Sequence, residues 1–279
     1  MALHLKLDPD ETSATIVRFI RDYFAAAGAK DAVIGLSGGL DSAVVAALAA
    51  RALGPTRVHA YALPSKTNVP ADLDDARAVA NILGISLETR DIQPLVDAAL
   101  KSLGGEKTVA VVANVMARSR MILLYAEAQR HKALVLGTGN KSELLTGYFT
   151  KHGDGGSDLL PIGDLYKTQV RELAPHLGIP SSIIAKPPTA GLFQGQTDEA
   201  DLGMAYTKLD LVLLGLEVDL PPERIAKEAG VAASEVARLE TVRRRSQHKR
   251  QAPPMPKLGI RTSGTDWRDP VMGRHAVGG

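Results

Sequence analysis

The sequence predicts an α/β protein in which a doubly wound parallel sheet is flanked by helices, with additional helices toward the C-terminus. Short apolar segments alternate with segments of helical length up to about residue 136. Strands that alternate with helices form parallel sheets, because each helix carries the chain back across the sheet. Two of the apolar segments run directly into glycine-containing turns, SGGLDS and GTGNKSE, which places both turns at the ligand-binding edge of such a sheet.

The predicted elements follow one another closely from residue 9 onward. Over residues 9–27 the side chains of Ile16, Ile20 and Phe24 recur at helical spacing, and Gly28 stands at a C-cap position. The apolar segment 32–36 predicts the first strand, and the alanine- and valine-rich segment 43–53 predicts the next helix. The other predicted elements are strands at 57–63, 85–92 and 133–136 and helices at 71–83, 94–103 and 108–131.

The second half of the chain has a different texture. A loop rich in glycine and aspartate follows residue 150, a helix is predicted at 167–177, and further helices continue to about residue 247. Residues 251–279 contain several prolines and show no periodicity, so we expect this tail to be extended or partly disordered. We therefore expect a single domain over residues 1–250 followed by the tail 251–279.

Composition excludes several classes of function. The chain contains no cysteine, so it has no disulfide, no thiolate metal site and no cysteine nucleophile. Thirty-three Lys and Arg residues against 31 Asp and Glu residues give a net charge of +2, which disfavours nucleic acid as a main partner. The first residues contain no continuous apolar segment, and no apolar run is long enough to span a membrane. We expect a soluble, cytoplasmic protein.

The segment Ser37-Gly38-Gly39-Leu40-Asp41-Ser42 has the features of a phosphate-binding turn. Its glycines permit positive φ and bring backbone N–H groups close to an anion, and the following helix adds the positive end of its dipole. No Gly-Lys-Ser/Thr follows, so the segment is not a Walker loop. It resembles instead the pyrophosphate loop of ATP pyrophosphatases. Asp41 either caps the helix or holds a magnesium ion beside phosphates.

Two long segments of the second half carry a more specific resemblance. GTGNKSELLTGYFTKHGDGGSDLLPIGDLYKTQVREL and KPPTAGLFQGQTDEADLG, together with SGGLDS and the later QHKR, resemble the ammonia-dependent NAD synthetases over roughly residues 10–260. The resemblance implies an adenine nucleotide α-hydrolase-like fold. It also implies ATP-dependent amidation of deamido-NAD with ammonia, through an acyl-adenylate, to give NAD, AMP and pyrophosphate in the last step of NAD biosynthesis.

The same resemblance implies a set of site residues. Asp41 and Glu143 would bind Mg²⁺, as hard carboxylate oxygens do beside phosphates. The deamido-NAD substrate would contact Arg118, Lys151, Asp158, His248 and Lys249. Taken singly, Glu143, Arg118 and His248-Lys249 would be read as solvated surface residues. ATP, the co-substrate, would be held by Gly35, Leu36, Ser37, Gly38, Gly39, Leu40, Asp41, Ser42, Thr138, Lys167 and Thr189.

Three further expectations concern ammonia, closure and assembly. The amidation step needs neutral ammonia, and we hypothesise that Asp154 attracts ammonium and accepts its proton. The loop 191–197 is either a lid or a static surface loop. The family forms homodimers, and the apolar helix over 109–125 either supplies that interface or belongs to the core. Without a cysteine nucleophile or the length of a glutaminase domain, the chain should use free ammonia, unless a separate glutaminase chain supplies it.

Two alternatives remain open. One is another adenylating enzyme with the same loop, such as the synthetase part of GMP synthetase or an enzyme that modifies transfer RNA. The other is a nonenzymatic module that senses AMP or ATP on the same fold. The near-neutral charge and the absence of cysteine oppose the RNA enzyme, and paired magnesium carboxylates oppose the sensor.

Overall fold

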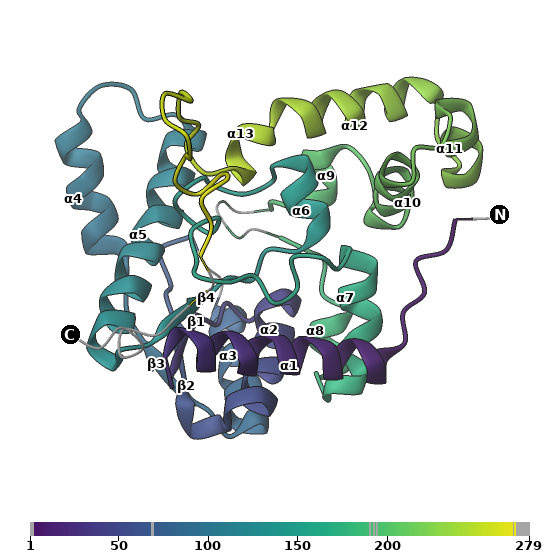
Figure 1. Cartoon of the computed structure of the whole chain (residues 1–279). Coiled ribbons are helices and arrows are strands. Elements are labelled where there is room, and N and C mark those ends of the chain that lie inside the picture. Colours follow the sequence, from purple (N-terminus) through teal and green to yellow (C-terminus); the bar gives the residue numbers. More distant parts are fainter. Residues whose placement is uncertain are drawn as a thin grey trace.

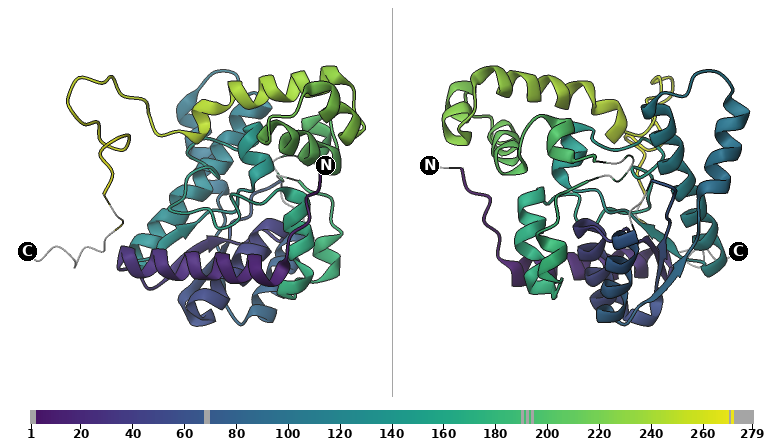
Figure 2. Two further views of the ribbon diagram at one scale, coloured as in Figure 1. Left: turned by 45° about the vertical axis from the view of Figure 1, so that its right-hand side comes forward. Right: turned by 180° about the vertical axis from the view of Figure 1, so that it is seen from behind.

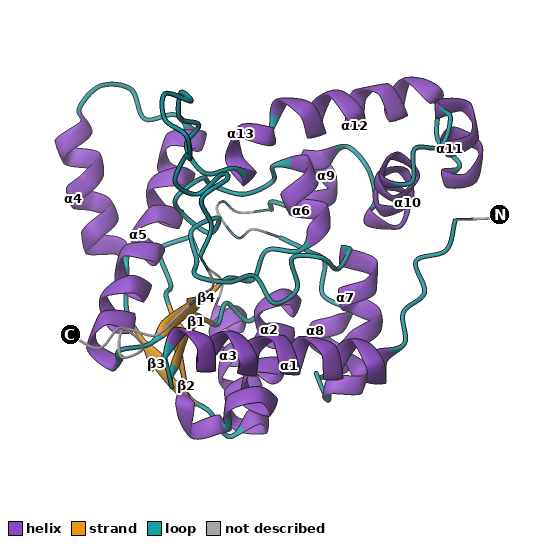
Figure 3. Ribbon diagram, in the orientation of Figure 1, coloured by secondary structure: helices purple, strands orange, loops and turns teal. Residues whose placement is uncertain are grey.

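The computed structural model describes residues 3–67, 70–189, 191, 193, 195–269 and 271. Within these residues the strands form one parallel sheet in the order β3-β2-β1-β4 (Figure 3). The strands are β1 (Ala32–Gly35), β2 (Val58–Ala62), β3 (Ser86–Thr89) and β4 (Leu134–Leu136). The predicted fold class is confirmed.

Helices surround the sheet and continue beyond it. Those of the first half are α1 (Pro9–Ala27), α2 (Leu40–Leu53), α3 (Pro70–Leu83), α4 (Gln93–Leu103), α5 (Val109–His131) and α6 (Lys141–Thr146), with a 3-10 turn η1 (Pro55–Arg57). Those of the second half are α7 (Lys167–Leu173), α8 (Ser181–Ile184), α9 (Asp198–Leu202), α10 (Tyr206–Glu217), α11 (Pro222–Ala229), α12 (Ala233–Arg245) and α13 (Gln247–Arg250), with a 3-10 turn η2 (Pro175–Leu177).

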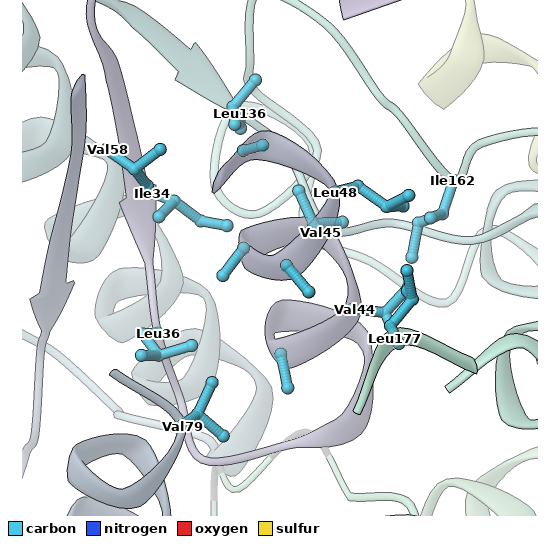
Figure 4. Close-up of a cluster of buried hydrophobic side chains, with 14 of the residues drawn as sticks. Ile34, Leu36, Val44, Val45, Leu48, Val58, Val79, Leu136, Ile162 and Leu177 are labelled. Atoms are coloured by element: carbon cyan, nitrogen blue, oxygen red, sulfur yellow. The ribbon is translucent and has the colours of Figure 1, made fainter. Parts of the chain in front are cut away.

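The sheet separates two hydrophobic layers because alternate strand residues face opposite sides. Ile34 and Leu136 face a core shared with α1, α2, α3 and α7, whereas Val33, Tyr61 and Val135 face α4 and α5. Figure 4 shows side chains of the first layer: Ile34, Val58 and Leu136 of the sheet lie on one side of α2, and Val44 of α2 lies beside Leu177 and Ile162 on the other. Burial on all sides explains why α2 reads as an almost continuous run of alanine and valine rather than an amphipathic helix.

The C-terminal helices form a separate layer. Figures 1 and 2 show α9 to α13 on the side of the molecule opposite α1 and α3, with α6 between them. Their apolar side chains make a third cluster that includes Leu209, Leu213 and Ile225, and Tyr166 at the start of α7 joins it. This cluster attaches the additional helices to the α/β domain at α6 and α7.

The structure differs from the sequence-based elements at several places. The strand predicted at 85–92 is shorter, since β3 covers Ser86–Thr89, and the short helix α8 was not predicted. The helix predicted at 167–177 is divided into α7 and η2, because Pro175 lacks an N–H group and cannot continue the α-helical bonding. The short helix α6 was not predicted, although Asn140 and Glu143 form a capping box at its start. Residues 251–269 contain no helix or strand beyond an isolated bridge between Ser263 and Trp267.

Helix α5 is, among the described helices, the one that is long and apolar enough to cross a membrane by length and composition. In the fold it packs against β1, β4 and α4. Its arginine residues Arg118 and Arg120 donate to the carbonyl oxygens of Lys151 and Leu63 within the same domain. These contacts are those of a helix that covers a sheet.

A stacked histidine pair lies on the α5 side of the sheet, and we expect it to make stability depend on pH. The rings of His59 and His131 lie 3.8 Å apart, centroid to centroid. Burial and the neighbouring His131 lower the pKa of His59 below its ordinary 6.5, although Asp31 opposes them. Because the unfolded chain then binds the proton more readily, stability should be lost as the pH falls from 6.5 toward the folded pKa.

We expect urea unfolding to show a larger loss of stability between about pH 7.5 and about pH 5.5 for the wild type than for His59→Gln. The loss of stability should be smaller in the variant, because glutamine lacks the imidazole whose protonation the folded protein disfavours. An NMR titration of the His59 ring should give a midpoint below 6.5. A midpoint above that value would contradict this account.

Candidate active site

The strand order places two loops side by side. β1 pairs with β2 on one side and with β4 on the other. The chain therefore builds the sheet toward one edge from β1 to β3 and then crosses to the other edge for β4, which makes the gap between β1 and β4 a switch point. Ligands in open α/β sheets bind beyond the carboxyl ends of the strands at such a switch point. The loop after β1, residues 36–39, and the loop after β4, residues 137–140, both leave the sheet there.

The loop after β1 is braced by its two serines. The Ser37 N–H donates to the Ser42 hydroxyl at 3.2 Å, and the Gly39 N–H donates to the Ser37 hydroxyl at 3.2 Å. The Ser42 hydroxyl donates to the Gly39 carbonyl oxygen at 3.0 Å. Gly39 precedes α2 without a side-chain cap, so the first N–H groups of α2 are free to face an anion.

Gly38 is required by its surroundings as well as by its conformation. Its φ is +79°, and a Cβ atom there would lie 2.1 Å from the carbonyl oxygen of Asp72 near the start of α3. A side chain at this position would therefore meet backbone, which cannot turn away as a flexible side chain can.

A cavity of about 690 Å³ opens between the two loops and the C-terminal layer. Its walls come from both halves of the chain, including the loops after β1 and β4, α7 and the segment around Thr189. All the residues expected to hold ATP line this cavity except Gly38, which lies against the backbone of Asp72. Part of the expected lid also lies here, since Gly191 and Gln196 line the cavity, whereas Leu192 and Gln194 lie outside the described residues.

A buried ion pair stands at the centre of the cavity wall. Lys167, at the first position of α7, is 4% exposed, and its Nζ donates to the Asp41 carboxylate. The Asn140 side-chain amide approaches the other oxygen of Asp41 at 3.5 Å. Glu143 lies three residues after Asn140 in the first turn of α6. The capping box fixes its side chain, because the Asn140 N–H donates to the Glu143 Oε2 at 3.1 Å.

The charges of this centre are not balanced. Burial and the neighbouring Asp41 raise the pKa of Glu143 well above its ordinary value, against the opposing effect of Lys167. Burial lowers the pKa of Lys167, but Asp41 and Glu143 outweigh it, so the pKa is raised and the ammonium form is favoured. One lysine is therefore shared by more carboxylates than it can neutralise.

Asp198 adds a further carboxylate that the sequence interpretation missed. It is 4% exposed, it lines the cavity, and its Oδ1 has no hydrogen-bond partner. Burial raises the pKa of Asp198, while Lys167 acts to lower it. A buried, unpartnered carboxylate oxygen in a cavity is costly unless a cation or a donor from a ligand reaches it.

The sequence interpretation also missed three cationic side chains in the cavity wall. Arg171 lies one turn after Lys167 on α7, and its Nε is buried without a partner. Lys186 Nζ donates to Asp72 at 2.5 Å and to Asp75 at 2.8 Å. Arg120 lies on α5. The spacing of Lys167 and Arg171, four residues apart on one predicted helix, was the available signal for Arg171.

Asp154 lines the end of the cavity that Lys249 and Arg120 also line. Asp154 is accessible to solvent because it faces the cavity, but protein atoms surround its carboxylate. The resulting loss of hydration raises the pKa of Asp154. The Thr150 N–H donates to Asp154 at 2.8 Å, and Lys249 and Arg120 act to lower the pKa. Lys249 lines the same end and donates to the carbonyl oxygens of Gly147 and Phe149.

The other residues expected to contact a second substrate lie outside the cavity lining. Arg118 donates to the Lys151 carbonyl oxygen at 3.3 Å, and Lys151 Nζ donates to the His248 carbonyl oxygen at 3.0 Å. These three therefore form one exposed group beside Lys249. Asp158 is separate from them, because its carboxylate accepts from the β4 residue Val135 at 2.7 Å.

The fold and this site define a nucleotide-binding domain of the doubly wound α/β class. The profile of the NAD synthase family matches residues 12–253. An NH₃-dependent NAD⁺ synthetase from Methanosarcina mazei is 46% identical over 255 residues, which are 90% of this chain and all of the relative. One from Thermococcus kodakarensis is 45% identical over 253 residues, 90% of this chain and 99% of that relative. The chain belongs to the NAD synthase family, which confirms the resemblance seen in the sequence.

Solved structures agree with this assignment. A structure described as NMN synthetase from Francisella tularensis has a TM-score of 0.81 at 38% identity and covers 90% of this chain and 100% of its own. An NH₃-dependent NAD synthetase from Campylobacter jejuni has a TM-score of 0.77 at 31% identity with the same coverage. A glutamine-dependent NAD⁺ synthetase from Acinetobacter baumannii, at 28% identity, matches 97% of this chain but 51% of its own length.

Proposed function

We propose that this protein is an ammonia-dependent NAD synthetase, which uses ATP to convert deamido-NAD into NAD, AMP and pyrophosphate. Family membership over residues 12–253 supports the reaction. The observation that carries the proposal in the structure is the Lys167–Asp41 pair at the switch point, which joins the start of α2 after the phosphate loop to the start of α7. This arrangement suits an enzyme that cleaves ATP better than a module that only binds it.

The phosphates of ATP are assigned to the loop after β1 and to Lys167. The uncapped start of α2 presents its first N–H groups to the phosphates, while the two serines brace the loop itself. Thr138 after β4 and Thr189 line the same cavity and complete the assigned ATP site with Gly35 and Leu36. The carboxylate of deamido-NAD attacks the α-phosphorus, the bond to pyrophosphate breaks, and Lys167 with the loop N–H groups stabilises the charge on the departing pyrophosphate.

Mg²⁺ is assigned to Asp41 and Glu143. The excess of carboxylates over Lys167 and the unpartnered oxygen of Asp198 are features that a divalent cation would relieve. No group of three metal-binding side chains is close enough within the described residues to enclose an ion. Mg²⁺ usually takes one or two carboxylates together with phosphate oxygens, so the two residues fit it. When bound, it would neutralise charge on the phosphates.

The dinucleotide is assigned to the exposed group Arg118, Lys151 and His248, to Lys249 beside it, and to Asp158. The cations suit the pyrophosphate of deamido-NAD, and a carboxylate suits a ribose hydroxyl. Lys249 lines the cavity beside Asp154, so the exposed group next to Lys249 would lead the nicotinate ring toward the ATP in the cavity. Ammonia then attacks the carbonyl carbon of the acyl-adenylate, and AMP leaves.

Asp154 is assigned to ammonia. Its raised pKa makes it a better proton acceptor than an ordinary aspartate, and it faces the cavity end where Lys249 lies. We expect Asp154→Asn to lower the rate of NAD formation about 100-fold at low ammonium while pyrophosphate release on adenylation persists. Following NAD and pyrophosphate separately would measure both steps. Full ammonia-dependent turnover by this variant would exclude the role.

We also propose the wider organisation of the protein. A single domain over residues 1–250 carries the site, the tail 251–279 lies outside it, and the protein works in the cytoplasm as a homodimer. Val109, Ile122 and Tyr125 are exposed apolar side chains of α5 that suit an interface between two copies. Free ammonia is the assigned nitrogen source, and a separate glutaminase chain is the alternative.

The reaction is tested by incubating pure protein with ATP, Mg²⁺, ammonium or glutamine, and one of two acids. Deamido-NAD tests the main proposal, and nicotinate mononucleotide tests NMN synthesis, which the likeness to the Francisella structure makes the second candidate. Stoichiometric NAD and AMP with ammonium would support the proposal. Turnover of the mononucleotide alone would replace it, and ATP binding without turnover of either acid would favour a nucleotide sensor.

A further inference from the structure

Asp210 of α10 lies fully buried between the starts of two helices of the site. It is 0% exposed, and its carboxylate accepts three hydrogen bonds. The Ser142 hydroxyl donates to one oxygen at 2.6 Å. The Thr168 N–H donates to the other oxygen at 2.9 Å, and the Thr168 hydroxyl donates to it at 2.8 Å. A buried carboxylate with this many donors is fully engaged in binding protein groups.

The donors to Asp210 are the direct chain neighbours of the charged centre. Ser142 precedes Glu143 in α6, and Thr168 follows Lys167 in α7. The Lys167 N–H also donates to the Ser142 hydroxyl at 2.9 Å, which closes a ring of hydrogen bonds between the two helix starts. Two of the orphan N–H groups at the first turn of α7, those of Lys167 and Thr168, are thus satisfied by a side chain of α6 and a side chain of α10.

We propose that Asp210 is a positioning residue for ATP binding, which holds Glu143 and Lys167 at a constant separation without touching the substrate. α10 presents a second residue in the same direction, since the Tyr206 ring, one turn before Asp210, lies 5.7 Å from Lys167 Nζ. The C-terminal helical layer is therefore a structural part of the ATP site. This role rests on the ATP site of the proposed function, but it does not depend on which acid the enzyme amidates.

Asp210→Asn tests this assignment at nearly constant volume. An amide has one acceptor oxygen and a donor NH₂ group, so either the Ser142 hydroxyl or the two Thr168 donors would face a donor. We expect the Kd of ATP, measured by calorimetry on the folded variant, to rise about 10- to 100-fold, as on loss of other groups that orient a ligand-binding side chain. The KM for ammonium should change little.

Leu209→Ala is the matched control for a stability effect alone. Leu209 is also 0% exposed, and it packs in the same helix within the apolar cluster of the C-terminal layer. The control should lose as much stability as Asp210→Asn, or more, and keep the wild-type Kd for ATP. If Asp210→Asn lowers the melting temperature but binds ATP as the wild type does, the positioning role is wrong.

Ser142→Ala gives a milder second test that does not depend on the folding of Asp210→Asn. It removes the group that both donates to Asp210 and accepts from Lys167, so ATP binding should weaken. In the double variant the losses should be far from additive, because the ring acts as one unit. Wild-type ATP affinity in Ser142→Ala, or additive losses in the double variant, would overturn the proposal. Absence of NAD formation in the wild type would refute the proposed reaction instead.

Discussion

Replacement of Lys167 by methionine should reduce NAD formation about 100- to 1000-fold, as expected on loss of a group that stabilises charge in the transition state. Lys167 is 4% exposed and pairs with Asp41. Among the described residues that line the cavity, no other lysine is buried. The variant should also be less stable, because removal of one partner of a buried pair typically costs about 3–5 kcal/mol. Initial rates and urea unfolding measure the two effects.

Lys141→Met separates the loss of catalysis from the loss of stability. Lys141 pairs with Glu217 at 2.6 Å and with Asp164 at 3.0 Å, and its side chain is 16% exposed. It lies on α6 but does not line the cavity. We expect this variant to lose stability and to keep its turnover within about twofold, as for other sites without contact to a ligand. Turnover by Lys167→Met within tenfold of the wild type would show that Lys167 does not stabilise the departing pyrophosphate.

Gly38→Ala should have the second largest effect. The positive φ of Gly38 costs an L-residue about 1–2 kcal/mol, and its new Cβ would lie 2.1 Å from the Asp72 carbonyl oxygen. Either the phosphate loop or the start of α3 must move to relieve the contact. Because misplacement by about 1 Å can reduce catalysis about 100-fold, we expect ATP affinity and turnover to fall together. Calorimetry with ATP and initial rates provide the measurements.

Gly178→Ala is the matched control for backbone strain. Gly178 has a φ of +78°, almost the same as Gly38, but nothing lies within 4 Å of a Cβ atom there. It ends η2, and it does not line the cavity. We expect this variant to lose stability through strain alone and to bind ATP as the wild type does. Equal ATP affinities in the two variants would mean that the contact with Asp72 has no effect on the loop.

The amino-acid sequence by itself determined the fold class and the order of strands and helices along the chain, and it predicted a phosphate loop between the first strand and its helix. These features depend on local information: the periods of apolar residues in strands and helices, glycine and proline at helix ends, and short motifs that follow strands. Residues of the long family-like segments, such as Lys167 and Glu143, could also be named from the sequence. Their neighbours in space could not.

Only the tertiary structure decided which groups meet. Lys167 reaches Asp41 across 126 residues of chain, and Lys186 reaches Asp72 across 114. The need for glycine at position 38 comes from the backbone of α3, and the burial of Asp210 comes from packing of the C-terminal layer on α6 and α7. Asp210 and Asp198 carry no distinct local signal. Contacts between distant segments depend on how whole layers pack, and local propensity contains no information about that packing.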